Sequence, residues 1–217
     1  MRMRKKKHAD ERIAACDAYR LHAKADEVID VTTVFTDNTK PLHLEIGCGK
    51  GGFACGMSAA HPEVNFIAME RVSDVACLAL EKAAASASER PDNLRFLIGD
   101  ARQLTEMFPA KSFDCIYLNF SDPWPKSGYH KRRLTYRAFL EQYRTLLKDG
   151  GILRLKTDND GLFAFSLEEF AAANLEIVWQ TDDLHASPYN EGNVMTEYEK
   201  NFSEKGFSIC SAWVKFN

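Results

Sequence analysis

The stretch that decides the fold is Pro41-Leu42-His43-Leu44-Glu45-Ile46-Gly47-Cys48-Gly49-Lys50-Gly51-Gly52. Alternating apolar residues at Leu42, Leu44 and Ile46 predict a strand. The glycines that follow allow a tight turn that a ligand can approach closely. Residues 53–60 predict a helix, whose first free N–H groups would face the turn. A strand, a glycine-rich turn and a helix in this order are typical of a nucleotide-binding site.

The glycine turn fits two motifs. Residues 47–52 match the dinucleotide fingerprint Gly-x-Gly-x-x-Gly, with Glu70 about 20 positions further on as a ribose partner. Residues 45–51 read Glu-x-Gly-x-Gly-x-Gly, which resembles the first motif of S-adenosylmethionine-dependent methyltransferases. In that interpretation Glu45 helps to hold a methionine moiety with its ammonium group, whereas the same carboxylate would repel a pyrophosphate. The charge of Glu45 therefore favours the methyl donor over a dinucleotide, and the position of Glu70 disfavours a turn that serves packing alone.

The composition is typical of a globular protein. The 217 residues, 45% hydrophobic and 27% charged, suffice for one α/β domain and are few for two. No stretch approaches the roughly 20 apolar residues of a membrane span, and the basic start lacks the apolar core of a signal peptide. We expect a cytoplasmic protein with no membrane partner and a single domain over residues 1–217, in which residues 1–40 form a basic tail and a helical extension.

The cysteines and the net charge limit which metals and nucleic acids the protein can be expected to bind. The six cysteines include no Cys-x-x-Cys pair and mostly stand in apolar surroundings, which favours buried thiols and no metal site. The net charge of −3 is unlike that of many nucleic-acid-binding domains. Any such binding must come from a local basic patch, and the candidates are residues 1–7 and 126–133.

Strand and helix patterns alternate along the chain. An N-terminal helix is expected over residues 10–29, and Gly150-Gly151 should end a helix before the next strand. Further strands are expected over 65–69, 94–98, 113–118, 152–156, 175–181 and 207–216, and helices over 73–90, 102–107, 135–147 and 162–173. The alternation predicts an α/β fold with a mostly parallel seven-stranded sheet, helices on both faces and an antiparallel last strand.

Four acidic residues follow successive strands of the predicted sheet: Glu45, Glu70, Asp100 and Asp122. Ligands of open α/β sheets bind beyond the carboxyl ends of the strands, so these acids suggest one shared site. Glu70 would accept hydrogen bonds from ribose hydroxyls, and Asp100 with the backbone around Ala101 would take an adenine amino group. Helix N-caps are the alternative for Asp100 and Asp122.

The loop over residues 119–133 is the most informative segment after the turn. Two prolines around Trp124 stiffen the backbone and present Asp122 at low entropic cost. The basic cluster behind it, Lys126 with residues 130–133, would supply phosphate contacts beside a stacking aromatic ring. The alternative is a surface loop with a solvated run of charges.

Four segments together resemble the bacterial tRNA (guanine-N7-)-methyltransferase family, the TrmB type: residues 45–51, 119–126, 156–159 and 196–199. The resemblance implies a Rossmann-like class I methyltransferase fold, S-adenosyl-L-methionine as donor, and methylation of guanine 46 in the variable loop of tRNA. By motif it assigns cofactor binding to Glu45, Gly47, Gly49, Glu70, Asp100, Ala101 and Asp122. It assigns substrate binding to Lys126, Asp158, Thr196, Glu197, Tyr198 and Glu199, and RNA contacts to Gly128, Tyr129, His130, Lys131, Arg132 and Arg133.

Guanine N7 carries a lone pair and no proton, so methyl transfer to it needs no general base. Asp122 is the expected catalytic residue, because a carboxylate stabilises the cation that forms on the base. Asp158 would help to orient the base, and Trp124 or Tyr198 would stack on it. Thr196-x-x-Glu199 also fits a helix capping box. Residues 182–193 are either a flap over the substrate or a solvated connection.

Three other classes stay open. Asp122-Pro123-Trp124-Pro125 resembles the Asp/Asn-Pro-Pro-aromatic motif of amino-group methyltransferases. A nicotinamide-dependent oxidoreductase fits the turn but lacks an obvious acid/base pair for hydride chemistry. A cofactor-free RNA-binding module is the non-enzyme alternative. The expected state is a monomer or a homodimer, with tRNA as partner and no metal.

Overall fold

The computed structural model describes residues 6–23, 27–86 and 92–216. It divides into two compact units, Met1–Pro109 and Ala110–Asn217, each described here by itself. The prediction of a single domain stays a prediction. The first five residues of the expected basic tail, and residues 87–90 of the helix expected over 73–90, lie outside the described residues.

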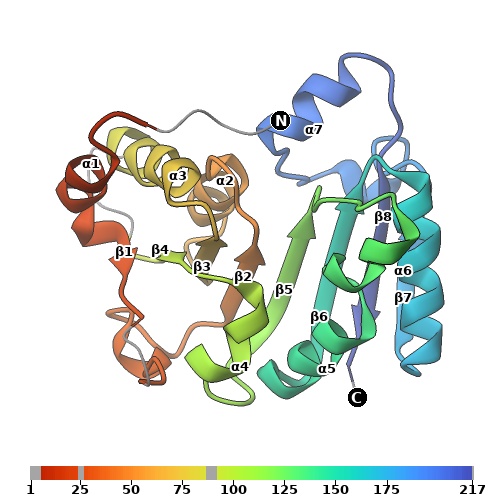
Figure 1. Ribbon diagram of the computed structural model, residues 1–217, viewed down its shortest axis with the longest axis horizontal. Coiled ribbons are helices and arrows are strands. Elements are labelled where there is room, and N and C mark those ends of the chain that lie inside the picture. Colours follow the sequence, from red (N-terminus) through yellow and green to blue (C-terminus); the bar gives the residue numbers. More distant parts are fainter. Residues whose placement is uncertain (1–5, 24–26, 87–91, 217) are drawn as a thin grey trace. The chain divides into compact units, whose positions relative to one another are not determined.

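The first unit has a parallel sheet whose strands lie in the order β1, β4, β3, β2 (Figure 1). Their bounds are β1 Arg20–Leu21, β4 Leu94–Ile98, β3 Asn65–Glu70 and β2 Leu42–Ile46. The four central residues of β3 are apolar, and the strand is buried along its length except at Glu70. Such a run is typical of a parallel strand covered on both faces. The expected strands at 65–69 and 94–98 are therefore confirmed.

Two crossover helices connect these parallel strands. α2 (Gly52–Ala60) joins β2 to β3, and α3 (Ser73–Ser86) joins β3 to β4; both helices pack on β3 and β4. A short segment of η3 (Ala101–Gln103) and α4 (Leu104–Met107) follows β4, as the sequence predicts for residues 102–107. The loops that follow these strands, where the acidic residues lie, therefore lead into the N-termini of the next helices.

The N-terminal helix expected over residues 10–29 is wrong. The chain forms only α1 (Ala9–Ala15), then η1 (Asp17–Tyr19), the two-residue strand β1 and later η2 (Val31–Thr33). β1 pairs in parallel with β4, so the free edge of the sheet competes successfully with helix propensity. Arg12 holds α1 on α3 through two hydrogen bonds to Glu81, of 2.6 and 2.7 Å.

The second unit has a mixed sheet in the order β5, β6, β8, β7. The bounds are β5 Phe113–Asn119, β6 Leu147–Thr157, β8 Cys210–Lys215 and β7 Glu176–Thr181. β5 and β6 are parallel, and β8 runs antiparallel to both β6 and β7. The predicted antiparallel last strand is confirmed. β1 explains why the structure describes eight strands where the sequence predicts seven.

Three helices belong to the second unit: α5 Arg137–Leu146, α6 Asp160–Ala172 and α7 Glu197–Ser203. Short 3-10 turns, η4 Ser127–Arg132 and η5 Pro188–Asn190, lie in the loops before α5 and α7. α6 packs on β6, β7 and β8, so its buried Phe163 and Phe170 contribute to the core. α7 follows the long connection from β7.

The expected break at Gly150-Gly151 is also wrong. β6 starts at Leu147, directly after α5, and includes both glycines. Its pairing with β5 steps from Leu147 opposite Phe113 to Ile152 opposite Cys115, which marks an irregularity in the register. Gly150 has a φ of 77°, so the glycine serves the bulge within the strand rather than the end of the helix.

The six cysteines are free thiols, five of them buried and Cys55 partly so, as the sequence predicts. Among the described residues no group of three or more His, Cys, Asp or Glu side chains is placed to hold a metal ion. Within the same ranges, no helix has the length and apolarity needed to cross a membrane.

Candidate functional site

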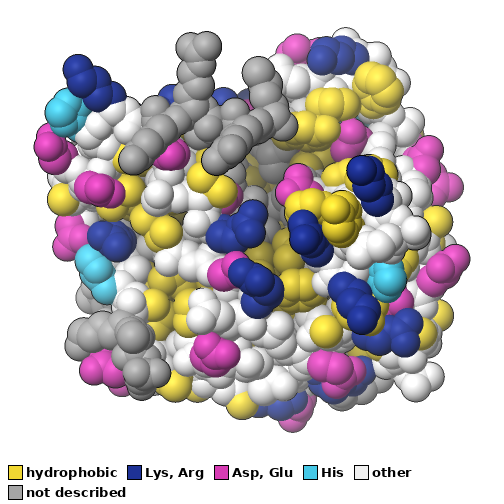
Figure 2. All heavy atoms as spheres, in the orientation of Figure 1, with side chains coloured by type: hydrophobic (Ala, Val, Ile, Leu, Met, Phe, Trp, Pro, Cys, Tyr) yellow, Lys and Arg dark blue, Asp and Glu magenta, His cyan; other side chains and the backbone are white. Residues whose placement is uncertain are grey.

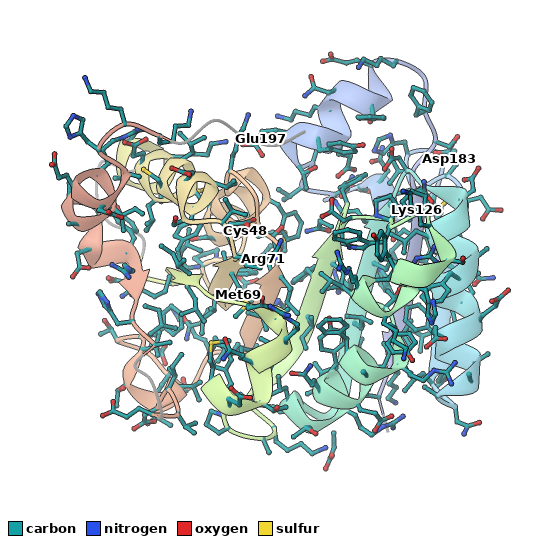
Figure 3. All side chains as sticks on the ribbon, viewed as in Figure 1. Cys48, Met69, Arg71, Lys126, Asp183 and Glu197 are labelled. Carbon is teal, nitrogen blue, oxygen red and sulfur yellow. The ribbon has the colours of Figure 1, made fainter. Side chains whose placement is uncertain are left out.

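The first part of the candidate site is the glycine turn of the first unit, residues 47–51, between β2 and α2. Gly47, Gly49 and Gly51 have φ values of 80°, 56° and 75°, a left-handed conformation that other residues rarely adopt. The N–H groups of Gly47 and Cys48 both donate to the Met69 carbonyl, at 2.8 and 2.9 Å. These bonds fix the turn to the end of β3, where Figure 3 labels Cys48 and Met69.

The three glycines have different surroundings. A Cβ at Gly51 would stand 2.8 Å from the Cβ of Ala79 on α3, so this glycine serves the packing of turn against helix. A Cβ at Gly47 or Gly49 would meet nothing within 4 Å. Packing therefore does not explain these two glycines, and the space beside their backbone suits a ligand.

Glu45 and Glu70 frame this turn. Glu45, the fourth residue of β2, is only 4% exposed. Glu70 ends β3, and its Oε2 accepts a hydrogen bond from the Gly49 N–H at 3.1 Å while Oε1 accepts one from Val72 at 2.8 Å. Each carboxylate oxygen can accept a further hydrogen bond. Glu70 therefore orients the turn and keeps capacity for ribose hydroxyls.

Asp100 lies where the sequence predicts, at the start of η3 and next to the half-buried Ala101. Its carboxylate accepts from the Arg102 N–H at 3.0 Å and from the Arg102 guanidinium at 3.0 and 2.7 Å. These hydrogen bonds hold the pKa of Asp100 below its ordinary value. Asp100 is thus both an N-cap and an ionised acceptor.

Cys48 is the second residue of the turn and is only 7% exposed. Burial, reinforced by the nearby charges of Glu45 and Glu70, raises the pKa of this thiol well above its ordinary value. Cys48 therefore stays a protonated, apolar part of the turn and is no nucleophile.

The second part of the candidate site is the loop that follows β5 in the second unit. Phe120 and Trp124 have φ values of 53° and 41°, which non-glycine residues adopt only at a cost. The Phe120 N–H donates to the Lys156 carbonyl at 2.8 Å and so ties the start of the loop to β6. Asp122 and Lys126 are both exposed on this loop, where Figure 3 labels Lys126.

The basic cluster continues from this loop into η4. Lys131 and Arg132 are exposed, while Arg133 is partly buried. The Arg132 guanidinium lies 4.9 Å from the Trp124 ring and 4.5 Å from the Tyr129 ring. Figure 2 shows Lys and Arg side chains beside hydrophobic ones over this segment. Cations next to aromatic rings are suited to unpaired nucleotides.

The third part is α7, also in the second unit. Thr196 and Glu199 form the capping box that the sequence allows, with the Glu199 N–H donating to the Thr196 hydroxyl at 2.9 Å. The Tyr198 hydroxyl, on a 43% exposed residue, donates to Asp158 at 3.2 Å. Burial, then the Asp158 carboxylate, raises the pKa of Tyr198 to about 12, so this hydroxyl remains a donor at neutral pH.

Glu199 is fully buried at the centre of a polar network. Its Oε2 accepts from the Lys156 ammonium at 2.8 Å, and its Oε1 contacts His185 at 2.9 Å and the Asn193 amide at 2.8 Å. The Lys156 ammonium also donates to Asn193 and to the Val194 carbonyl, both at 3.1 Å. Glu199 thus connects β6, the 182–195 segment and α7. Its predicted contact with substrate stays a prediction.

The structure therefore groups the predicted residues by unit. Glu45, Gly47, Gly49, Glu70, Asp100 and Ala101 belong to the first unit, and all the other predicted site residues belong to the second. Sequence reasoning left the network around Lys156 unassigned. A lysine at the end of the predicted strand Ile152–Lys156 was the available signal, because a buried cation requires a carboxylate partner.

Comparison with solved structures shows which fold the chain has. The crystal structure of the 16S rRNA methyltransferase KamB matches with a TM-score of 0.64 and 13% identity, over 91% of this chain and 99% of that one. TrmN from Thermus thermophilus matches with a TM-score of 0.54 and 21% identity, over 96% of this chain and 48% of that one. The fold is that of a Rossmann-like methyltransferase. A family model described as "Putative methyltransferase" matches residues 39–212.

Sequence relatives define the family. A tRNA (guanine-N(7)-)-methyltransferase from Mesoplasma florum is 42% identical over 220 residues, with 99% of each chain covered. One from Streptococcus pyogenes serotype M1 is 45% identical over 218 residues, covering 100% of both chains. The chain belongs to the tRNA (guanine-N(7)-)-methyltransferase family.

Proposed function

We propose that this protein transfers a methyl group from S-adenosyl-L-methionine to N7 of a guanine in tRNA, at position 46 of the variable loop. The observation that carries the proposal is the end-to-end similarity, at 42–45% identity, to relatives named for this activity. The enzyme would act on tRNA in the cytoplasm, as a monomer or a homodimer.

In this proposal the first unit holds the donor. Gly47 and Gly49 support it because their backbone adjoins open space, which leaves room for a ligand to lie against the turn. Glu70 would accept the ribose hydroxyls, Asp100 and the Ala101 backbone would take the adenine, and Glu45 would face the ammonium group. When bound, the donor would supply a methyl group activated by its sulfonium: the new N–C bond forms as the C–S bond breaks in line, and the sulfur would leave as the neutral thioether of S-adenosylhomocysteine.

The second unit would hold the acceptor. Lys131 and Arg132 are exposed cations suited to phosphates, and Trp124 and Tyr129 are aromatic surfaces beside them. We assign Asp158 and Tyr198, joined by their 3.2 Å hydrogen bond, to positioning of the guanine. Lys126 and the residues from Thr196 to Glu199 complete the proposed substrate set.

Asp122 is the proposed catalytic residue. N7 needs no base, and the positive charge moves from sulfur to the purine as the methyl group passes. An exposed carboxylate on a loop stiffened by Pro123 and Pro125 can stabilise that charge once bound substrate excludes water. Productive transfer also requires N7 to come within about 3–3.5 Å of the methyl group.

Nucleoside analysis tests the proposal. The protein is incubated with labelled donor and bulk tRNA lacking this modification, and the RNA is digested and separated. We expect label in 7-methylguanosine, and a guanine-to-adenine change at position 46 should abolish it. Label in an N-methylated amino group would assign the protein to the amino-group methyltransferases. No labelled nucleoside with any tRNA would refute the proposal.

Asp122→Asn separates catalysis from binding. The amide keeps the shape of the side chain but not its charge, so we expect a loss of about 100-fold or more in single-turnover rate with tRNA affinity little changed. Lys131→Gln is the matched control on the same segment, and it should weaken tRNA binding with the bound rate retained. An unchanged single-turnover rate in Asp122→Asn would remove Asp122 from the mechanism.

A further inference from the structure

Arg133 differs from its exposed neighbours in the basic cluster. It is partly buried, and its Nε donates to the Pro123 carbonyl at 2.9 Å while its Nη2 donates to the Trp124 carbonyl at 3.2 Å. The guanidinium also lies 4.3 Å from the ring of Phe165 on α6. Three contacts therefore hold this side chain against its own unit.

Both carbonyls belong to the loop that carries Asp122. Pro123 and Trp124 follow Asp122 directly, and Trp124 has the left-handed φ of 41°. A non-glycine residue stays in this conformation only where surrounding contacts hold it. The planar fork of an arginine can bond two carbonyl groups at once, which a lysine ammonium on a flexible stem does much less well.

Arg132 provides the contrast. It is the preceding residue and carries the same charge, yet it is exposed and its guanidinium lies between the rings of Trp124 and Tyr129. Its position suits a contact with an incoming phosphate or base. The two adjacent arginines therefore have different roles, although the motif resemblance assigns both of them to RNA contacts.

We propose that Arg133 is a positioning residue, which fixes the Asp122 loop through the Pro123 and Trp124 carbonyls and does not contact RNA phosphate. This inference deepens the proposed function and rests on it. Its consequence is that Arg133 acts on the rate of methyl transfer in the bound complex, whereas Arg132 acts on tRNA affinity.

Charge-conserving variants test this division. Arg133→Lys keeps the positive charge but cannot make both carbonyl bonds, so we expect the single-turnover rate to fall at least tenfold with the dissociation constant for tRNA changed less than about twofold. Arg132→Lys is the comparison: lysine stacks less well on the Trp124 and Tyr129 rings, so we expect the dissociation constant for tRNA to rise by a larger factor than the single-turnover rate falls. If position 133 contacted phosphate instead, Arg133→Lys would leave both the single-turnover rate and the dissociation constant little changed, because lysine also binds phosphate, and this result would overturn the inference.

Salt dependence gives a second readout. A residue that neutralises one phosphate contributes roughly 0.7–0.9 to the slope of log affinity against log salt. We expect Arg133→Gln to leave that slope unchanged and Arg132→Gln to reduce it. A reduced slope in Arg133→Gln with an unchanged single-turnover rate would overturn the inference.

Folding is checked independently. Titration with S-adenosylhomocysteine and thermal melts report whether each variant is intact. Should Arg133→Gln fail to fold, Phe165→Leu removes only the ring beside the guanidinium, and it should lower the single-turnover rate several-fold at unchanged salt slope. An unchanged rate in Phe165→Leu and Arg133→Lys would refute the inference. Absence of 7-methylguanosine with the unmodified protein would instead refute the proposed function.

Discussion

The glycine turn of the first unit and the α7 region of the second unit are held in place by different kinds of interaction. The turn over residues 47–51 is fixed by backbone: three left-handed glycines and hydrogen bonds to the Met69 carbonyl. α7 is fixed by side chains from distant parts of the chain, since Lys156 and Glu199 are 43 positions apart. A local motif therefore encodes the first region, and a buried charge network encodes the second.

This difference has an energetic consequence. A backbone turn fails when a glycine acquires a side chain, because the φ values or the space no longer fit. A buried ionic network fails when one partner is removed, because the other charge remains buried without compensation. The two regions should thus respond to different substitutions, and the largest effects should come from the buried pair.

Lys156→Met should destabilise the protein most. Lys156 and Glu199 side chains are 9% and 0% exposed. The substitution leaves a buried carboxylate with no lysine ammonium and with only His185, Asn193 and the Thr196 N–H as partners, at a cost of about 3–5 kcal/mol in the free energy of unfolding. Chemical denaturation measures this cost.

Lys148→Met is the matched control for that comparison. Lys148 lies on the same strand, and its ammonium is also 2.8 Å from a carboxylate, that of Asp114, but the side chains are 46% and 33% exposed. A surface pair contributes roughly 0–1 kcal/mol. Equal losses in the two variants would contradict a special role for the buried network.

Gly51→Ala and Gly47→Ala separate packing from ligand binding in the turn. Both force a left-handed φ on alanine, at about 1–2 kcal/mol. Only Gly51→Ala also crowds Ala79, adding about 1–3 kcal/mol. Denaturation should show that Gly51→Ala is less stable than Gly47→Ala. Calorimetry should show that Gly47→Ala binds S-adenosylhomocysteine more weakly than the unmodified protein, by more than its loss of stability explains. Full affinity in Gly47→Ala would argue against a ligand over this glycine.

Thr196→Val tests the capping box with a smaller effect. The substitution removes the hydroxyl that accepts from the Glu199 N–H but keeps the shape of the side chain. Loss of an N-cap costs about 0.5–2 kcal/mol. A cost of this size, measured by denaturation, would place the cap below the Lys156 pair. A cost equal to that of Lys156→Met would contradict this ranking and make the cap as important for α7 as the pair.

The acid sensitivity of the second unit should depend on Glu199. Burial raises the pKa of this carboxyl, but Lys156 and the hydrogen bonds from Lys156, Asn193 and His185 outweigh burial, and the pKa is lowered overall. A lowered folded pKa gives stability that is present above the unfolded value of about 4.3 and is lost as pH falls through the folded pKa.

Denaturation between pH 7 and pH 3 measures this dependence. The difference in unfolding free energy between the unmodified protein and Glu199→Gln should stay constant down to about pH 5 and shrink below about pH 4.3. A difference that grows towards pH 3 would show that the pKa of Glu199 is raised and would contradict the network described here.

Local patterns in the sequence predict much of the first unit. The glycine turn and the strand ends at Glu70 and Asp100 appear where expected, because glycine conformation and apolar runs act over a few residues. The helix over residues 10–29 fails, since pairing of Arg20–Leu21 with β4 depends on a sheet edge far along the chain. Helix propensity carries no information about that edge.

Less of the second unit can be predicted from the sequence. The antiparallel β8 and the capping box at Thr196 follow from local patterns. The bonds from Arg133 to the carbonyls of Pro123 and Trp124 do not, because a run of basic residues does not reveal which member turns inward. The motif resemblance assigns these residues to RNA binding. It does not distinguish a residue that contacts RNA from one that holds the loop in place.

A crystal soaked with S-adenosylhomocysteine tests the central claim most directly. The account predicts electron density over Gly47–Gly51, with the ribose hydroxyls within hydrogen-bond distance of Glu70 and the adenine near Asp100. Density at any other place, with the glycine turn left bare, would contradict the assignment of this turn to the methyl donor and with it the proposed reaction.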